Sequence, residues 1–147
     1  MRNTNEMELI FDSLSANEGF ARVAVAAFMT QLNPTVEEVA DVKTAISEAV
    51  TNAVIHGYEN EIHKIFIRCN IKEETIYIEV EDHGKGIEDV KKAMEPLFTT
   101  KPEMDRSGMG FSFMDHICVE SVQGEGTTVK MQKTIGKGRK LWTTQSL

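Results

Sequence analysis

Apolar and polar residues alternate along several segments of the chain, which is the pattern of strands that bury one face. These segments are residues 7–14, 65–71, 76–80, 117–122 and 127–133. The polar residues 72–74 separate the second segment from the third, and the glycine-containing residues 123–126 separate the last two. Each of these pairs of segments is therefore predicted to form an antiparallel hairpin.

The second of two predicted helices has the clearest start signal in the chain. Thr35 and Glu38 have the T-x-x-E spacing of a capping box, in which each side chain bonds the other residue's backbone N–H. The helix is predicted to run to Gly57, where glycine supplies a stop. Its apolar stripe consists of Val36, Val39, Val42, Ile46, Val50 and Ala53.

The first helix and the segments after the first hairpin are less regular. A helix is predicted from residue 18 to about residue 32, with Asn17 as its cap and the Asn-Pro pair at 33–34 after its end. A short helical segment is predicted over residues 88–94. Residues 95–107 have no periodicity and form a loop of a length that is usually functional in a compact domain.

The order of these elements predicts the fold class. A strand, two helices, a hairpin, a loop and a second hairpin indicate an α+β two-layer sandwich, with a mostly antiparallel sheet and the helices on one face. The length of 147 residues suits one domain, which is predicted over residues 1–136. Residues 137–147 contain Lys137, Arg139 and Lys140 with no acid, and they are predicted to be a flexible basic tail.

Composition and charge narrow the possible partners and location. A formal net charge of −7 disfavours binding to nucleic acid or to an anionic membrane surface. No apolar stretch is long enough to span a bilayer, and the N-terminus lacks the apolar run of a secretion signal. Cys69 and Cys118 fall within apolar alternation and are predicted to be buried thiols. The expected location is the reducing cytoplasm.

The second helix carries the first candidate site, made of Glu48, Asn52 and His56. Residues four apart lie on one side of a helix, so these side chains share an arc beside the apolar stripe. The Asn52 carbonyl oxygen could ligate Mg²⁺, a cation that keeps waters and phosphate oxygens as its other ligands. Glu48 could then accept a proton from an attacking hydroxyl. The alternative is an exposed polar face with hydrogen bonds along the helix.

A second candidate site follows the strand at residues 76–80. Asp82 continues the apolar face of that strand, where a carboxylate is costly unless it is paired. The exocyclic amino group of an adenine could supply the pairing, and Gly84 and Gly86 would let the backbone approach a flat ring. The alternative is a tight turn with a capping Asp.

Two further segments suit a polyphosphate. Arg106, with Gly108 and Gly110, opens a possible short helix, and backbone N–H groups in a glycine-rich turn at a helix start bind anions. The hydroxyls and the cation of Thr99, Thr100 and Lys101 suit a lid over phosphates. The alternatives are a structural glycine turn and a mobile surface loop. A Walker A motif and a dinucleotide-binding fingerprint are absent from the sequence.

These motifs, in this order, resemble the GHKL (Bergerat) ATP-binding superfamily. Residues 48–57 resemble its N box, residues 82–86 its G1 box, residues 106–111 its G2 box, residues 96–101 its ATP lid and residues 126–128 its closing hairpin. The resemblance implies ATP and Mg²⁺ as cofactors, Glu48 as catalytic base and Asn52 as metal ligand. The nucleotide-binding residues it implies are Asn52, His56, Asp82, Gly84, Gly86, Ile87, Thr99, Thr100, Lys101, Arg106, Ser107, Gly108, Met109, Gly110, Phe111 and Thr128.

Within the superfamily, the chain is similar to the sporulation anti-sigma factors over nearly its whole length. That resemblance implies a homodimer that inhibits a sporulation sigma factor and acts as a serine kinase on the anti-sigma-factor antagonist, with Arg22 on the surface that both partners use. Residues 110–116 are about one helical turn shorter than the corresponding helix of the family. The open alternatives are a nucleotide-gated sequestering module without phosphotransfer and a stress-response anti-sigma kinase. A sensor histidine kinase is disfavoured, because no dimerising helices with a phosphoacceptor His precede Glu48.

Overall fold

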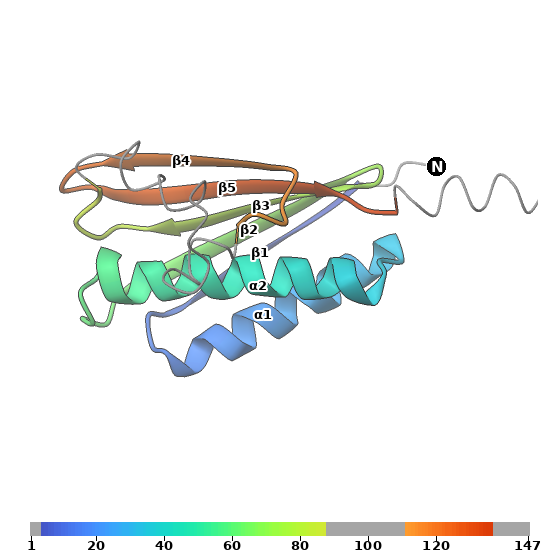
Figure 1. Cartoon of the computed structure of the whole chain (residues 1–147). Helices are drawn as coiled ribbons and strands as arrows, with labels where there is room; N and C mark the ends of the chain where they lie inside the picture. Colours follow the sequence, from blue (N-terminus) through green and yellow to red (C-terminus); the bar gives the residue numbers. More distant parts are fainter. Residues whose placement is uncertain (1–3, 88–110, 137–147) are drawn as a thin grey trace, which may run out of the picture.

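The computed structural model describes residues 4–87 and 111–136 as two packed layers (Figure 1). One layer is a 5-stranded antiparallel sheet with the strand order β1-β2-β3-β5-β4, and the other consists of two helices on one of its faces. The elements are β1 (Thr4–Asp12), α1 (Ala16–Met29), α2 (Val36–Asn52), β2 (Lys64–Lys72), β3 (Thr75–Asp82), β4 (His116–Val122) and β5 (Gly126–Thr134). The predicted α+β sandwich is confirmed.

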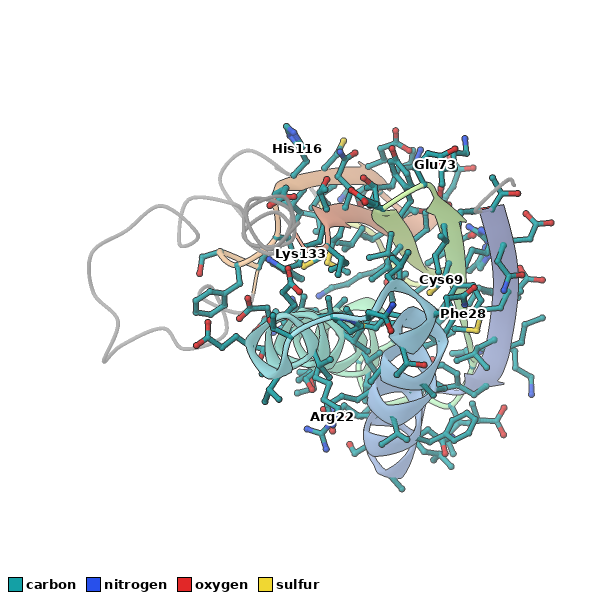
Figure 2. All side chains as sticks on the ribbon, turned by 90° about the vertical axis from the view of Figure 1, so that its right-hand side faces the viewer. Arg22, Phe28, Cys69, Glu73, His116 and Lys133 are labelled. Atoms are coloured by element: carbon teal, nitrogen blue, oxygen red, sulfur yellow. The ribbon has the colours of Figure 1, made fainter. Side chains whose placement is uncertain are left out.

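The two faces of the sheet differ in polarity. Inward-facing residues of β2 and β3 are fully or almost fully buried, and they are Ile65, Ile67, Cys69, Ile71, Ile76, Ile78 and Val80. On the outer face, Arg68 forms ion pairs with Glu8, Glu79 and Glu81. Figure 2 shows Cys69 and Phe28 between the layers and His116 on the outer face. Helices cover a single face because only that face offers apolar surface to bury.

The predicted capping box at the start of α2 is confirmed. The Thr35 hydroxyl oxygen accepts from the Glu38 N–H at 3.1 Å, and the Glu38 carboxylate accepts from the Thr35 N–H at 2.8 Å. The other Glu38 oxygen accepts from the Gly136 N–H at 2.9 Å and so holds the chain beyond β5. Val36 is 86% exposed, so its assignment to the apolar stripe is wrong. The stripe begins one turn later, where α2 passes under the sheet.

The predicted cap of α1 is wrong. The helix begins at Ala16, and the side chain of Asn17 donates to the Asp12 carbonyl at 2.9 Å instead of accepting from the helix. Asn17 therefore ties the first turn to the end of β1. The helix ends at Met29, and a short 3-10 helix (Thr30–Leu32) leads to Asn33 in the left-handed region at φ 52°.

Cys118 also departs from prediction. It is exposed on the outer face of the edge strand β4, whereas Cys69 is buried as predicted. Residues 111–115 form turns and bends and no helix. The segments predicted at 88–94, 95–107 and 137–147 lie outside the described residues. No described helix has the length and apolar character needed to cross a bilayer.

Candidate functional site

The carboxylate of Asp82 lies at the end of β3, on the face of the sheet that the helices cover. Asp82 is 7% exposed and pairs across the sheet with Ile65 and Thr127. Its Oδ1 accepts from the Gly84 N–H at 2.9 Å. Burial raises the pKa of this carboxyl, and the backbone N–H groups of Gly84 and Thr127 offset part of that effect. None of the described residues forms a salt bridge with Asp82, so a buried carboxylate remains able to accept from a ligand.

The end of the second helix packs directly against this carboxylate. A β-carbon placed on Gly57 would lie 2.8 Å from the Asp82 Oδ1, so a larger residue there would require the carboxylate to move. Here the α-helix gives way to a π-helical turn (Ala53–Gly57), a feature that is frequent at functional sites. Figure 1 shows the end of α2, the end of β3 and the β4–β5 turn at the same end of the sandwich. The fold thus joins the predicted N box to the predicted G1 box.

The glycines of the predicted G1 box have a packing role that the sequence did not indicate. A β-carbon on Gly84 would lie 2.0 Å from the Gly57 carbonyl oxygen, and one on Gly86 would lie 2.3 Å from that of Val122. Gly86 also has a φ of 76°, which L side chains rarely adopt. These positions are filled by the protein's own backbone. Close backbone contact, rather than room for a ring, therefore accounts for both glycines in this structure.

The strand register places Thr127, not Thr128, beside Asp82. Thr128 pairs with Glu81 and lies on the outer face, so its assignment to the nucleotide is not supported by its position. The Thr127 hydroxyl lies 2.8 Å from the Ser121 hydroxyl, which accepts from the Ile87 N–H at 2.7 Å. Thr127 and Ser121 were missed as site residues. The signal that could have found Thr127 is the hairpin register, because an antiparallel partner of Asp82 shares its face.

Glu48 and Asn52 lie on α2, at partly buried positions one turn apart and ahead of the π-helical turn. His56 follows on that turn and is exposed. Among residues 4–87 and 111–136, no three His, Cys, Asp or Glu side chains are grouped as a metal site. The donor set still suits Mg²⁺, since this cation takes few protein ligands and completes its shell with water and phosphate oxygens.

The predicted phosphate-binding residues mostly lie outside the described part of the chain. They are Thr99, Thr100, Lys101, Arg106, Ser107, Gly108, Met109 and Gly110. Phe111 is described, and at 7% exposure its side chain belongs to the hydrophobic core. Its contribution to a ligand site would therefore come through its backbone. Ile87 is partly buried, and its N–H is already bonded to Ser121.

Arg22 lies on α1 close to α2, on the side of the helix layer away from the sheet (Figure 2). Its guanidinium is 3.5 Å from the Glu18 carboxylate, one turn earlier on α1. The same group is 3.5 Å from the hydroxyl of Ser47, the residue before Glu48. The Arg22 side chain is 42% exposed. A partner that contacts Arg22 would therefore sit next to the turn of α2 that carries Glu48.

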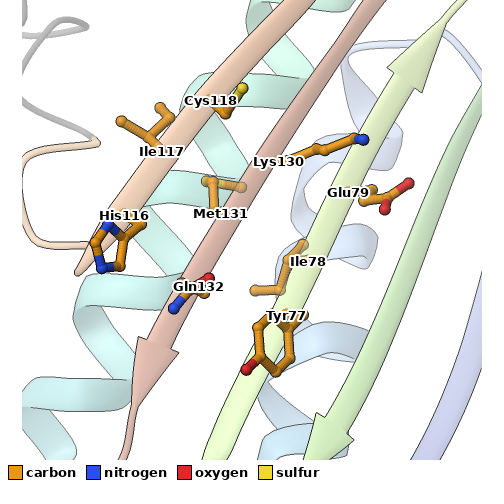
Figure 3. Close-up of a pocket in the computed structure, with 9 residues that line it drawn as sticks. All are labelled: Tyr77, Ile78, Glu79, His116, Ile117, Cys118, Lys130, Met131 and Gln132. Carbon is orange, nitrogen blue, oxygen red and sulfur yellow. The ribbon is translucent and has the colours of Figure 1, made fainter.

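A shallow hollow of about 450 Å³ lies across β3, β5 and β4 (Figure 3). Its polar lining consists of Tyr77, Glu79, His116, Cys118, Lys130 and Gln132. These side chains alternate with the buried residues of their strands, so they belong to the outer face of the sheet. Asp82 belongs to the other face. The hollow is therefore separate from the candidate nucleotide site.

Comparison with known proteins assigns the chain to a family. The histidine kinase-like ATPase domain family matches residues 12–133. An anti-sigma F factor of Caldanaerobacter subterraneus subsp. tengcongensis is 59% identical over 143 residues, which cover 95% of this chain and 100% of the relative. The anti-sigma F factor of Bacillus subtilis is 48% identical over 142 residues, covering 93% and 97%.

Solved structures share the fold at low sequence identity. The RsbU and RsbW domains of a Mycobacterium tuberculosis protein match with a TM-score of 0.66 at 18% identity, covering 89% of this chain and 32% of the other. The histidine kinase domain of a blue-light activated kinase from Erythrobacter litoralis matches with a TM-score of 0.56 at 15% identity, covering 84% and 64%. At such identities the likeness is one of fold.

Proposed function

The chain belongs to the histidine kinase-like ATPase family, in the branch of its anti-sigma F factor relatives, and from that premise we propose that it inhibits a sporulation sigma factor, sigma F. We propose further that it is a serine protein kinase that uses ATP to phosphorylate, and so inactivate, the anti-sigma-factor antagonist. The single observation that carries the nucleotide part is the position of the Asp82 carboxylate. It is buried, and it touches the end of the helix that bears Glu48 and Asn52.

Adenine recognition rests on Asp82 in this proposal. The carboxylate accepts from the exocyclic amino group of the base, which guanine lacks at that position. A charged acceptor in a buried site makes a strong hydrogen bond, because water does not compete for it. The close packing around Gly57 and Gly84 keeps the carboxylate in one place, so the base is recognised by a preformed acceptor.

Phosphoryl transfer rests on α2 and on the segments at 96–101 and 106–111. Bound Mg-ATP supplies the phosphoryl group. Asn52 would hold the metal through its carbonyl oxygen, and Glu48, one turn earlier, would accept the proton of the attacking serine hydroxyl. Thr99, Thr100, Lys101, Arg106 and the backbone of 107–111 would contact the phosphates. Two of the predicted nucleotide contacts have little support from their positions, because His56 is exposed and Thr128 lies on the outer face of the sheet.

Partner binding is assigned to the surface around Arg22. The proposed location is the cytoplasm, as composition indicates. A homodimer, which the resemblance implies, would present this surface next to Glu48 on each protomer. An antagonist serine that reaches Glu48 would therefore approach over Arg22. The same surface would serve the sigma factor, so the two partners would compete for it.

The kinase assignment is tested by mixing the purified protein with Mg-ATP and the purified antagonist and detecting phosphoserine by mass spectrometry. We expect Glu48→Ala to reduce phosphate transfer by about 100-fold or more, the usual scale for a general base, while nucleotide binding measured by calorimetry stays near that of the wild type. Glu37→Ala is the matched control, because Glu37 is an exposed carboxylate in the first turn of the same helix.

Two outcomes would contradict the assignment. Equal loss of binding and transfer in Glu48→Ala would make Glu48 a structural residue. An ATP-binding wild-type protein that transfers no phosphate would instead be a nucleotide-gated module that sequesters its sigma factor.

Arg22→Ala tests the partner surface. We expect this variant to bind ATP as the wild type does and to lose sigma factor in a pull-down, because the long exposed side chain is removed without opening the core. Lys43→Ala is a control on α2. A variant that retains sigma factor would remove Arg22 from the interface.

A further inference from the structure

The hydroxyl of Tyr58 is inserted between two strands at the point where they separate. The last paired residues of β2 and β3 are Ile65 and Asp82. At the next position, the His83 N–H donates to the Tyr58 hydroxyl oxygen at 2.7 Å, and that hydroxyl donates to the Lys64 carbonyl at 2.5 Å. A side chain thus replaces one direct backbone bond of the ladder. The bridging hydroxyl therefore sets the distance between the backbones of β2 and β3 at this position.

Tyr58 also fixes the end of the second helix. Its N–H donates to the Ala53 carbonyl at 2.9 Å, which closes the π-helical turn. Its side chain is buried, and the residue is 5% exposed. Tyr58 is therefore bonded at two points. Its backbone is bonded to the end of the helix, and its hydroxyl is bonded to His83, the first residue after β3, a position called here the exit of β3.

The residues next to these two points are the ones in closest contact. Gly57 precedes Tyr58, Asp82 precedes His83, and a β-carbon on Gly57 would lie 2.8 Å from the Asp82 carboxylate. The Lys85 N–H donates to the Gly57 carbonyl at 2.9 Å and closes the same junction. The position of the carboxylate relative to the helix thus depends on the distance that the tyrosine hydroxyl sets.

We propose that Tyr58 is a positioning residue for purine recognition, acting through Asp82. The inference rests on the proposed ATP-binding function and adds to it the residue that sets base selectivity. Without the hydroxyl, the His83 N–H and the Lys64 carbonyl lose their common partner, and the exit of β3 is free to shift. A carboxylate that has moved accepts poorly from an adenine amino group. Binding of the phosphates, which that carboxylate does not touch, is spared.

The experiment compares Mg-ATP with Mg-inosine triphosphate, whose base has a carbonyl oxygen in place of the amino group. Calorimetry on the full chain is expected to show that the wild type prefers ATP. In Tyr58→Phe we expect that preference to fall by about tenfold, the scale of one hydrogen bond to a charged acceptor. Tyr77→Phe is the matched control, because Tyr77 lies on the outer face of the sheet and the chain contains 2 tyrosines. Its preference should equal that of the wild type.

The ratio of the two affinities separates positioning from general destabilisation. A partly unfolded variant loses affinity for both nucleotides by the same factor, since both bind the same folded fraction. In the Asp82→Asn background, Tyr58→Phe should cause no further loss of preference if it acts through Asp82.

A second measurement keeps the test open if Tyr58→Phe does not fold. Fluorotyrosine incorporated into Tyr77→Phe labels Tyr58 alone, and its ¹⁹F resonance should shift more with ATP than with inosine triphosphate. Equal shifts, or an unchanged preference in Tyr58→Phe, would overturn the inference alone. A wild type that binds neither nucleotide would overturn the proposed function and the inference with it.

Discussion

Asp82 ends a strand whose other inward-facing residues are apolar, and none of the described residues pairs with it as a cation. Burial raises the pKa of its carboxyl. The charged form is therefore disfavoured by folding, and its ionisation at neutral pH destabilises the nucleotide-free protein. A ligand that donates to the carboxylate removes part of that cost. The charge on Asp82 thus lowers the stability of the nucleotide-free protein but strengthens nucleotide binding.

Asp82→Asn is expected to weaken ATP binding by about tenfold or more, since the acceptor loses its charge. The melting temperature of the nucleotide-free protein at pH 7 should not fall, because the amide removes the cost of a buried charge and its oxygen can still accept from the Gly84 N–H. Calorimetry and thermal unfolding check the two parts. Unchanged ATP affinity would remove Asp82 from the base site.

The effect of Asp82→Asn on the free energy of unfolding should depend on pH. With a folded-state pKa above the unfolded value, the destabilisation grows as pH rises from the unfolded pKa through the folded one. Below the unfolded pKa, about 3.9 for Asp, the carboxyl is neutral in both states, and the difference in stability between wild type and Asp82→Asn should no longer change with pH. A difference that grows toward acid would contradict a raised pKa.

Some individual residues could be assigned from sequence and others could not. Asp82 was found because it continues the apolar face of a strand. Thr127 and Thr128 are both threonines in one strand, and only the pairing register decides which of them shares a face with Asp82. The packing role of Gly84 depends on Gly57, a residue distant in sequence. Such a contact leaves no local pattern.

At the scale of elements, the two ends of α2 differ in how far the sequence determines them. The start is a capping box, which is a local interaction between Thr35 and Glu38 and was predicted from their spacing. The end is a π-helical turn held by bonds from Tyr58 and Lys85, which lie outside the helix. Periodicity gave the helix and its approximate stop. It did not give the change of helix type, because that change depends on the strand packed against it.

Lys133 joins three elements and should be important for their packing. Its ammonium donates to the Phe113 carbonyl at 2.7 Å and lies 3.6 Å from the Asp41 carboxylate of α2, with a side chain that is 11% exposed. Figure 2 shows Lys133 between the sheet and α2. Lys133→Met is expected to lower the free energy of unfolding by about 1–3 kcal/mol, because a carbonyl and a carboxylate lose their donor. Urea unfolding measures this change.

Lys130→Met is the control for that experiment. Lys130 lies on the same strand, on the outer face, where its ion pair with Glu120 is exposed. Its loss should change stability much less, because solvent screens exposed pairs. Equal effects of the two substitutions would contradict a special role for Lys133.

At the scale of the whole molecule, the order of elements was sufficient to predict a one-sided sandwich. The strands alternate, the helices fall between the first strand and the first hairpin, and a sheet with one apolar face needs one covering layer. Cys118 shows where this reasoning ended. Cys118 shares its face of the strand with His116 and Glu120, whereas Ile117 and Val119 lie on the other face. The prediction treated the thiol as an apolar side chain and did not weigh its polar neighbours on the same face. The segment after Phe111 likewise turns without forming the expected short helix.

The two thiols offer a probe of global unfolding. Burial raises the pKa of the Cys69 thiol to about 12, so it has almost no thiolate at pH 8, and Cys118 is exposed. Iodoacetamide followed by mass spectrometry should label Cys118 rapidly and Cys69 only as fast as the chain unfolds. Saturating ATP should slow the labelling of Cys69 and leave Cys118 unchanged. Rapid labelling of both thiols would contradict the buried position of Cys69.

The contact of Gly57, Asp82 and Gly84 also limits how sequences of this fold can drift. Two backbone segments far apart in the chain, at Gly57 and at residues 82–84, meet there, and a β-carbon on either glycine would clash with the other segment. A mutation that adds a β-carbon on one segment requires a shift of another, so tolerated changes must arrive together or in a favourable order. The β2–β3 turn, at the other end of these strands, contains no glycine. Substitutions among relatives should therefore accumulate at that end of the sheet. At the opposite end, the end of the second helix, the residues after β3 and the β4–β5 turn should change together or not at all.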